Sequence, residues 1–126
     1  MGARARQPQA ETERAGIMRP RLKVWVVVDD RVKFGDGRAS LLDAIVELGS
    51  LQRAVARFGM SYRGAWGYFR DLERAAGFPL LERHPGGGKT GGTRLTPEGR
   101  RFLERYRRFR RGLDAVVEGH FRRSFR

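Results

Sequence analysis

Two short amphipathic segments joined at a glycine occupy residues 50–76 and constrain the fold more than any other part of the chain. Each segment follows a serine, Ser50 or Ser61, whose hydroxyl can accept a hydrogen bond from a free N–H group in the first turn of a helix. Gly59 lies between them and permits a sharp turn. Apolar residues recur at helical spacing in both segments, so we expect each helix to bury one face. The predicted buried faces hold Leu51, Ala54, Val55 and Phe58 in the first helix, and Tyr62, Ala65, Phe69, Leu72 and Ala76 in the second.

The opposite face of the second helix gathers basic and aromatic side chains around a glycine. Arg63, Trp66, Gly67 and Arg70 fall together there, because residues three and four apart share one side of a helix. Two short helices with a tight turn between them, the second carrying such a face, are typical of a helix-turn-helix, whose second helix reads DNA. This outer face is therefore the candidate reading surface.

The net charge of +13 is spread unevenly along the chain. Residues 1–21 and residues 22–99 each contribute +3, whereas residues 100–126 contribute +7 from ten arginines and three acids. Such an excess is expected of a protein that binds a polyanion. The alternative is a basic surface that only keeps the protein in solution, and the placement of the arginines favours the first interpretation.

Several other kinds of site have little support. The chain has no cysteine, and its two histidines, His84 and His120, lie far apart without the spacing of metal ligands. No nucleophile has a nearby base, so we expect neither an enzyme nor a cofactor. The longest apolar run, Val24 to Val28, is much shorter than the roughly 18 residues of a membrane span. Residues 1–21 lack the apolar centre of a signal peptide, so we expect a cytoplasmic protein without membrane contact.

The segments on either side of residues 50–76 predict small β elements. Residues 22–28 and 32–34 are rich in β-branched and aromatic side chains and are separated by a pair of aspartates, which predicts an N-terminal β-hairpin. A helix then begins at Asp36, as its cap, and ends at Gly49. After the second amphipathic helix, residues 80–83 and 94–96 predict another hairpin, or wing.

The last helix is predicted to begin at Thr96-Pro97-Glu98, since threonine is a good cap and proline is tolerated in the first turn. It is expected to reach about residue 119. The whole is a mainly α-helical fold with small β elements, a winged helix-turn-helix with an N-terminal hairpin and a long C-terminal helix. We divide the chain into a flexible basic arm (1–21), a winged domain (22–96) and a dimerisation helix with a basic tail (97–126).

The last helix carries apolar side chains at alternating steps of four and three, which is the spacing of a heptad-like seam. The seam holds Phe102, Tyr106, Phe109, Leu113, Val116 and His120. We predict that its first five residues pair with a second copy of the chain, which gives a homodimer. In the alternative, the seam packs back on its own domain, and Gly112 and Gly119 weaken the helix enough to keep that alternative open.

Several short stretches carry a resemblance to a known family. They are Gly49-Ser50, Ala54, Ala56, Met60-Ser61-Tyr62, Ala65-Trp66, Pro79-Leu80-Leu81-Glu82-Arg83, the glycine-rich loop and Leu95-Thr96-Pro97-Glu98-Gly99. Over about residues 22–106 the chain resembles the DNA-binding domain of the ModE molybdate-responsive regulators, and it is more distantly similar to the LysR winged-helix group. The Ser-Tyr-x-x-Ala-Trp string and the double-glycine wing favour ModE.

The resemblance implies a winged helix-turn-helix that binds operator DNA as a dimer, usually at genes for molybdate uptake or molybdenum enzymes. It places Ser61, Tyr62, Arg63 and Trp66 on the recognition helix and residues 86–94 in the wing. Family members that sense molybdate carry an additional C-terminal oxyanion-binding module, whereas about 20 residues follow the resemblance here. We therefore expect no molybdate binding by this chain, and a signal that comes from elsewhere, such as a separate sensor subunit.

The candidate DNA contacts come from the reading surface and the wing. They are Ser61, Tyr62, Arg63, Trp66, Gly67, Arg70, Arg83, Lys89, Thr90 and Arg94. Arg63 and Arg70 can each bond to guanine or to a phosphate, and the alternative is a solvated helix surface. Trp66 and Tyr62 are equally open to DNA contact and to partial burial. The wing is better suited to phosphates than to bases, since a glycine-rich loop positions side chains loosely.

Two functions fit these observations. The one we expect is a sequence-specific transcription regulator that binds double-stranded DNA. The alternative is an architectural or RNA-associated basic protein that binds without specificity. The polar face that follows Ser61 favours the first, because a purely electrostatic binder does not need it.

Overall fold

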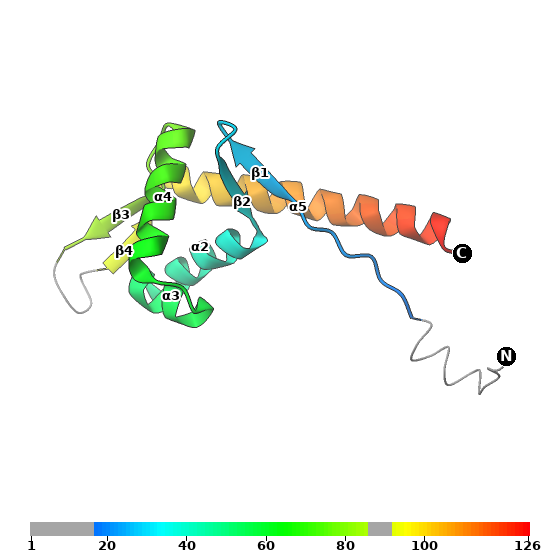
Figure 1. Ribbon diagram of the computed structural model, residues 1–126, viewed down its shortest axis with the longest axis horizontal. Coiled ribbons are helices and arrows are strands. Elements are labelled where there is room, and N and C mark those ends of the chain that lie inside the picture. Colours follow the sequence, from blue (N-terminus) through cyan, green and yellow to red (C-terminus); the bar gives the residue numbers. More distant parts are fainter. Residues whose placement is uncertain (1–16, 86–91) are drawn as a thin grey trace. The chain divides into compact units, whose positions relative to one another are not determined.

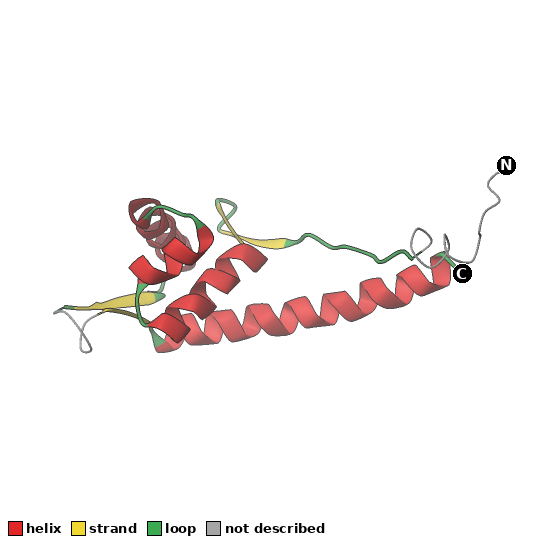
Figure 2. Cartoon of the chain, turned by 90° about the horizontal axis from the view of Figure 1, so that it is seen from below, coloured by secondary structure: helices red, strands yellow, loops and turns green. Residues whose placement is uncertain are grey.

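A computed structural model describes residues 17–85 and 92–126 (Figure 1). The elements in chain order are β1 (Trp25–Val28), β2 (Val32–Gly35), α2 (Asp36–Leu48), α3 (Leu51–Phe58), α4 (Tyr62–Ala76), β3 (Leu81–His84), β4 (Gly92–Leu95) and α5 (Pro97–Ser124). Residues 24–112 form one compact unit, and the described residues at the two ends of the chain, 17–23 and 113–126, belong to another. Helices dominate and the strands form two antiparallel hairpins (Figure 2), so the predicted fold class is confirmed.

The first hairpin pairs β1 with β2 around a tight turn. Three residues separate the paired strands, and the first two, Asp29 and Asp30, both have a φ of 54°, a left-handed conformation that aspartate tolerates. Val32 and Phe34 of β2 are buried, whereas β1 is largely exposed. β1 begins at Trp25 rather than at the predicted residue 22, because its partner strand ends at Gly35, where α2 follows.

The turn between α3 and α4 is built as the sequence predicts. Ser50 Oγ accepts a hydrogen bond from the N–H of Arg53 (3.1 Å), and Ser61 Oγ accepts one from the N–H of Gly64 (2.9 Å), so both predicted caps are confirmed. Gly59 has a φ of 66°, and this left-handed residue ends α3 and lets the chain reverse into α4.

The core lies between the three short helices, β2, the wing and the beginning of α5. Its largest fully buried side chains are Phe34, Phe69, Leu41, Leu42, Ile45, Leu51, Leu72 and Leu80. The prediction of burial is wrong for two residues of the predicted faces of α3 and α4: Phe58 is 40% exposed and Tyr62 is 41% exposed. Each is a terminal residue of its helix next to the Gly59 turn, and we attribute the exposure to its place beyond the crossing of the two helices.

The second hairpin, β3 with β4, is fixed to the helices at its base. The Glu73 carboxylate at the end of α4 accepts hydrogen bonds from the N–H groups of Leu80 (2.8 Å) and Leu81 (3.1 Å). On the other strand, the N–H of Thr93 donates to the Gly49 carbonyl at 3.1 Å. The wing therefore leaves the domain at a fixed angle to α4. Figure 1 shows the two hairpins on either side of that helix.

The predicted start of the last helix is confirmed, and the helix is longer than predicted. Thr96 Oγ1 accepts from the N–H of Gly99 (2.9 Å) and donates to the Pro79 carbonyl (2.6 Å). A Cβ at Gly99 would collide with the Leu80 carbonyl, so glycine permits this close approach of α5 to the chain before β3. The helix continues to Ser124.

The seam of α5 does not act as one surface. Tyr106 is 3% exposed, and its ring meets Phe34 edge-on at 5.1 Å; Phe102 is half-buried and meets the same ring at 4.8 Å. The prediction that Tyr106 is in a dimer interface is therefore wrong: this part of the seam packs on its own domain because β2 presents an aromatic partner. Phe109 and Val116 are 44% and 66% exposed.

Asp36 is also corrected from its predicted role as a helix cap. Gly35 occupies the cap position of α2, so this helix begins without a side-chain cap. The Asp36 carboxylate instead accepts a 2.5 Å hydrogen bond from the Tyr106 hydroxyl and is paired with Arg110 at 3.1 Å. The residue thus joins the start of α2 to α5.

Candidate nucleic-acid interface

The outer face of α4 is fully open in the compact unit. Arg63, Gly67 and Arg70 are exposed on the side of the helix opposite the buried residues Ala65 and Phe69. Among the described residues, no carboxylate lies within ion-pair distance of either arginine. Their charges are therefore available to an anion outside the protein.

The start of α4 is shaped by its cap. A Cβ at Gly64 would lie 2.7 Å from Ser61 Oγ, so a larger residue there would displace the serine hydroxyl that begins the helix. Ser61 is exposed, but its oxygen already serves this bond. Its hydroxyl hydrogen remains for a phosphate or a base, and a second lone pair remains for a base donor.

Trp66 lies at the boundary between the core and the reading surface. It packs partly against the core. The guanidinium of Arg70 lies 5.2 Å from its ring centroid, and that of Arg83, from β3, lies 4.7 Å from it. Both distances are within the range of a cation–π interaction. Its indole nitrogen Nε1 is buried and has no hydrogen-bond partner among the described residues.

Tyr62 completes this cluster at the helix start. Its ring meets Trp66 edge-on at 6.3 Å, and its hydroxyl oxygen accepts a hydrogen bond from Arg83 at 3.4 Å. Arg83 thus contacts two aromatic residues of α4 at once. We call Tyr62, Trp66, Arg70 and Arg83 the aromatic–arginine cluster. It joins the recognition helix and the wing into one surface.

The structure separates the two predicted basic residues of the wing strands. Arg83 pairs in register with the buried Thr93, and Arg94 pairs with Glu82. Because successive side chains of a strand point to opposite faces, Arg83 turns towards α4, whereas Arg94 lies on the other face of the hairpin beside a carboxylate. The predicted contacts Lys89 and Thr90 lie outside the described residues.

The inner side of α4 is held by a tyrosine that the sequence analysis passed over. The Tyr68 hydroxyl donates a 2.5 Å hydrogen bond to the Lys33 carbonyl on β2. Burial raises the pKa of this tyrosine to about 12, an effect that the nearby Arg38 partly opposes. This anchor fixes the position of α4 relative to the first hairpin.

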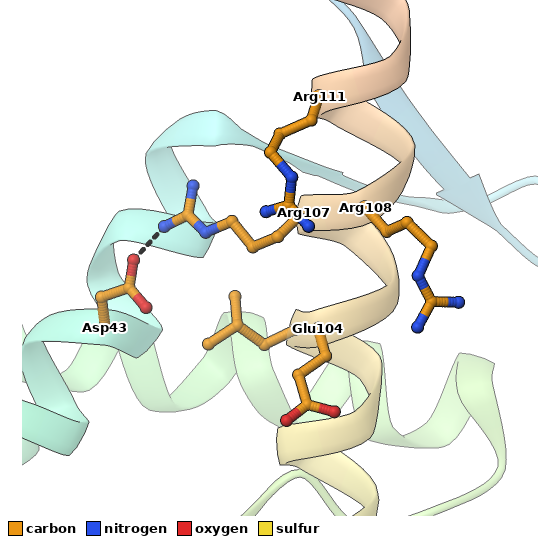
Figure 3. Close-up of a pocket in the computed structure, with 6 residues that line it drawn as sticks. Asp43, Glu104, Arg107, Arg108 and Arg111 are labelled. Atoms are coloured by element: carbon orange, nitrogen blue, oxygen red, sulfur yellow. Dashed lines mark hydrogen bonds and ion pairs between the residues drawn. The ribbon is translucent and has the colours of Figure 1, made fainter.

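A second group of arginines was also missed, on α5 where it faces α2. Figure 3 shows a hollow lined by Asp43, Leu103, Glu104, Arg107, Arg108 and Arg111. Arg107 is paired with Asp43 there, and Arg110 is paired with Asp36 nearby. The two carboxylates are seven residues apart, or about two helical turns, and the arginines are three apart. These two spacings do not match, so helical spacing in the sequence gives no signal for these ion pairs.

The described part of the chain holds no cluster of three or more His, Cys, Asp or Glu side chains placed to bind a metal ion. Within residues 17–85 and 92–126, no helix is both long and apolar enough to cross a membrane.

Comparison with known proteins agrees with this geometry. Residues 38–100, which run from α2 into the first turn of α5, match the model of the bacterial regulatory helix-turn-helix proteins of the lysR family. The match covers half of the chain. The chain belongs to this lysR family.

Individual relatives extend the assignment. The chain is 38% identical over 87 residues to the molybdenum transport protein ModE of Azotobacter vinelandii, and 38% identical over 69 residues to the transcriptional regulator ModE of Haemophilus influenzae. These matches cover 66% and 55% of this chain but only 32% and 27% of the relatives. The predicted resemblance to ModE is confirmed, and the chain matches about a third of the length of these ModE proteins.

The fold of this lysR-family chain also has a solved counterpart bound to DNA. The DNA-binding domain in the crystal structure of the CbnR–DNA complex is 28% identical, with a TM-score of 0.52. The match covers 71% of this chain and 97% of that domain.

Proposed function

We propose that this chain is a sequence-specific DNA-binding transcription regulator of the ModE type, acting in the cytoplasm. Family membership and the names of the ModE relatives support the class. The observation that carries the proposal is the aromatic–arginine cluster. It joins α4 to β3 through Trp66 and so presents a helix and a wing to DNA as one rigid surface.

In this proposal α4 enters the major groove, which is wide enough for an α-helix. Arg63, near the start of the helix, reads a base edge. Arg70 and Arg83, held against Trp66, bind phosphates on either side. Arg94 adds a phosphate contact from the outer face of the wing. Lys89 and Thr90 at the wing tip are proposed to do the same.

The regulator is proposed to bind as a homodimer through the open part of α5. Phe109, Leu113 and Val116 carry this interface, supported by the exposure of the first and the last of them. A symmetric dimer binds two half-sites, whose centres lie about 34–36 Å, or a multiple of that, apart.

Selection from a random-sequence duplex library tests the reading. A specific regulator enriches one sequence, and a salt titration then keeps a large affinity gap between that duplex and random DNA. A non-specific architectural or RNA-associated protein enriches none, and its affinities fall together as salt rises.

Sedimentation of Phe109→Glu tests the dimer. A charge in an apolar interface must be desolvated without a partner, so we expect a monomer that protects the selected duplex weakly. Phe58→Glu, at a comparably exposed phenylalanine on α3, is the matched control and stays dimeric. A dimeric Phe109→Glu variant contradicts the interface.

A further inference from the structure

Neither the backbone conformation nor the packing of the described residues requires a glycine at position 67. It lies in the interior of α4, where glycine is less favourable than alanine. Its φ is not in the left-handed region. A Cβ built on it meets no atom of the described residues within 4 Å.

Two other helical glycines show what a structural reason looks like. A Cβ at Gly64 would press on the Ser61 cap, and a Cβ at Gly99 would collide with the Leu80 carbonyl. At each of these positions another part of the chain lies against the glycine. Nothing described in the protein lies against Gly67.

Gly67 lies on the exposed face of α4 between two arginines. Arg63 lies one turn before it and Arg70 one turn after it on the same exposed face. Because glycine has no side chain, the helix surface is lower there, in a shallow depression between the two arginines. Gly67 is also the sixth residue of α4, beyond the first turn whose N–H groups are free. The depression therefore presents carbon-bound hydrogens rather than donors, which suits the edge of a base better than a phosphate.

We propose that Gly67 is the point at which DNA comes closest to α4, with a base edge in the major groove packed against its bare Cα. This inference rests on the proposed function and adds a residue that determines specificity without a side chain. A methyl group at this position would push the base edge away from the helix and separate Arg63 from the base that it reads.

The test compares Gly67→Ala with Gly37→Ala in the full chain. Gly37 is an exposed glycine of α2 whose added Cβ also meets nothing within 4 Å. The probes are the duplex selected by the unaltered chain and a random-sequence duplex of the same length. Thermal unfolding of each variant is measured alongside.

We expect Gly67→Ala to raise the unfolding midpoint by about 4 °C, since alanine favours the helix. The same variant should bind the selected duplex at least tenfold more weakly and bind random DNA as before. Gly37→Ala should bind both duplexes normally.

Three results would overturn the inference: full binding by Gly67→Ala, an equal loss on both duplexes, or an equal loss in Gly37→Ala. Failure of the unaltered chain to select any duplex would instead contradict the proposed function. The two failures are therefore separable.

Discussion

Two arginines of α4 and two of the first half of α5, residues 97–112, lie in opposite surroundings. On α5, Arg107 and Arg110 are paired with carboxylates of α2. On α4, Arg63 and Arg70 have no carboxylate within ion-pair distance among the described residues, and Arg70 lies against Trp66. The difference teaches that one residue type has two environments here: Arg107 and Arg110 join α5 to α2, whereas Arg63 and Arg70 are left for the DNA contacts proposed above.

Two tyrosines on the inner sides of the helices extend the comparison. Tyr68 on α4 and Tyr106 on α5 each donate a 2.5 Å hydrogen bond to the first hairpin or the helix that follows it. Both helices are thus anchored on their inner sides. The two helices differ in what their arginines contact. Arg63 and Arg70 of α4 face solvent, whereas Arg107 and Arg110 of α5 lie next to its buried face and pair with carboxylates of α2.

The largest effect is expected where α5 enters the core. Tyr106→Ala removes a ring that is 3% exposed and packed against Phe34, so it should lower the free energy of unfolding by about 3–5 kcal/mol. Denaturant titration measures the loss. Phe58→Ala, at a side chain that is 40% exposed, should cost under about 1 kcal/mol. Equal losses in the two variants would contradict the core role of α5.

Much of the fold follows from local signals in the sequence. The serine caps and the glycine between α3 and α4 act through neighbours within a few residues, and both serine caps were predicted correctly. The failures at Tyr106 and Asp36 share one cause. Each residue contacts a partner about seventy positions away, which local patterns cannot reveal. A heptad-like spacing identifies an apolar face but not its partner Phe34, and a helix-start signal does not show that Asp36 bonds to Tyr106.

On the reading surface too, local patterns were predicted from the sequence and long-range contacts were not. Helical spacing alone placed Arg63, Gly67 and Arg70 together on α4. It could not show that Arg83 of β3 lies over Trp66, because that contact depends on the strand register and on the angle at which the wing leaves the domain. The separation of Arg83 from Arg94 follows from the same register.

An intermediate effect is expected from removing one arginine from each of the two surroundings. Arg63→Ala should weaken binding to the selected duplex by about 1–3 kcal/mol more than binding to random DNA, if its side chain reads a base. Arg107→Ala removes the same charge from α5 and should leave this difference unchanged. Its own effect, on unfolding, should stay under about 1 kcal/mol because the pair with Asp43 is partly exposed.

Fluorescence anisotropy on both duplexes, at several salt concentrations, separates these outcomes. Equal losses on the two duplexes would make Arg63 a phosphate contact. A loss of specificity in Arg107→Ala would mean that α5 also takes part in reading, and the division between the two helices would fail.

The smallest effect is expected from the two tyrosine hydroxyls, and it appears as a pH dependence. Burial raises the pKa of Tyr106 to about 12, and its hydrogen bond to Asp36 acts in the same direction. The pKa of Tyr68 is also raised to about 12 by burial. In the unfolded chain both groups ionise near pH 10. The stabilisation is therefore complete below about pH 10 and is lost as the pH rises towards 12, where the unfolded chain has released protons that the folded chain still holds.

Tyr106→Phe and Tyr68→Phe should each cost about 1 kcal/mol at neutral pH, the usual worth of one hydrogen bond. Each should also make the decline in stability between pH 10 and 12 shallower than in the unaltered chain. Since the remaining lysines and arginines are common to all three proteins, the difference between curves isolates the tyrosine. An unchanged slope in Tyr106→Phe would mean that water reaches its hydroxyl, and α5 would then be held by the Arg107 and Arg110 ion pairs rather than by burial of the ring.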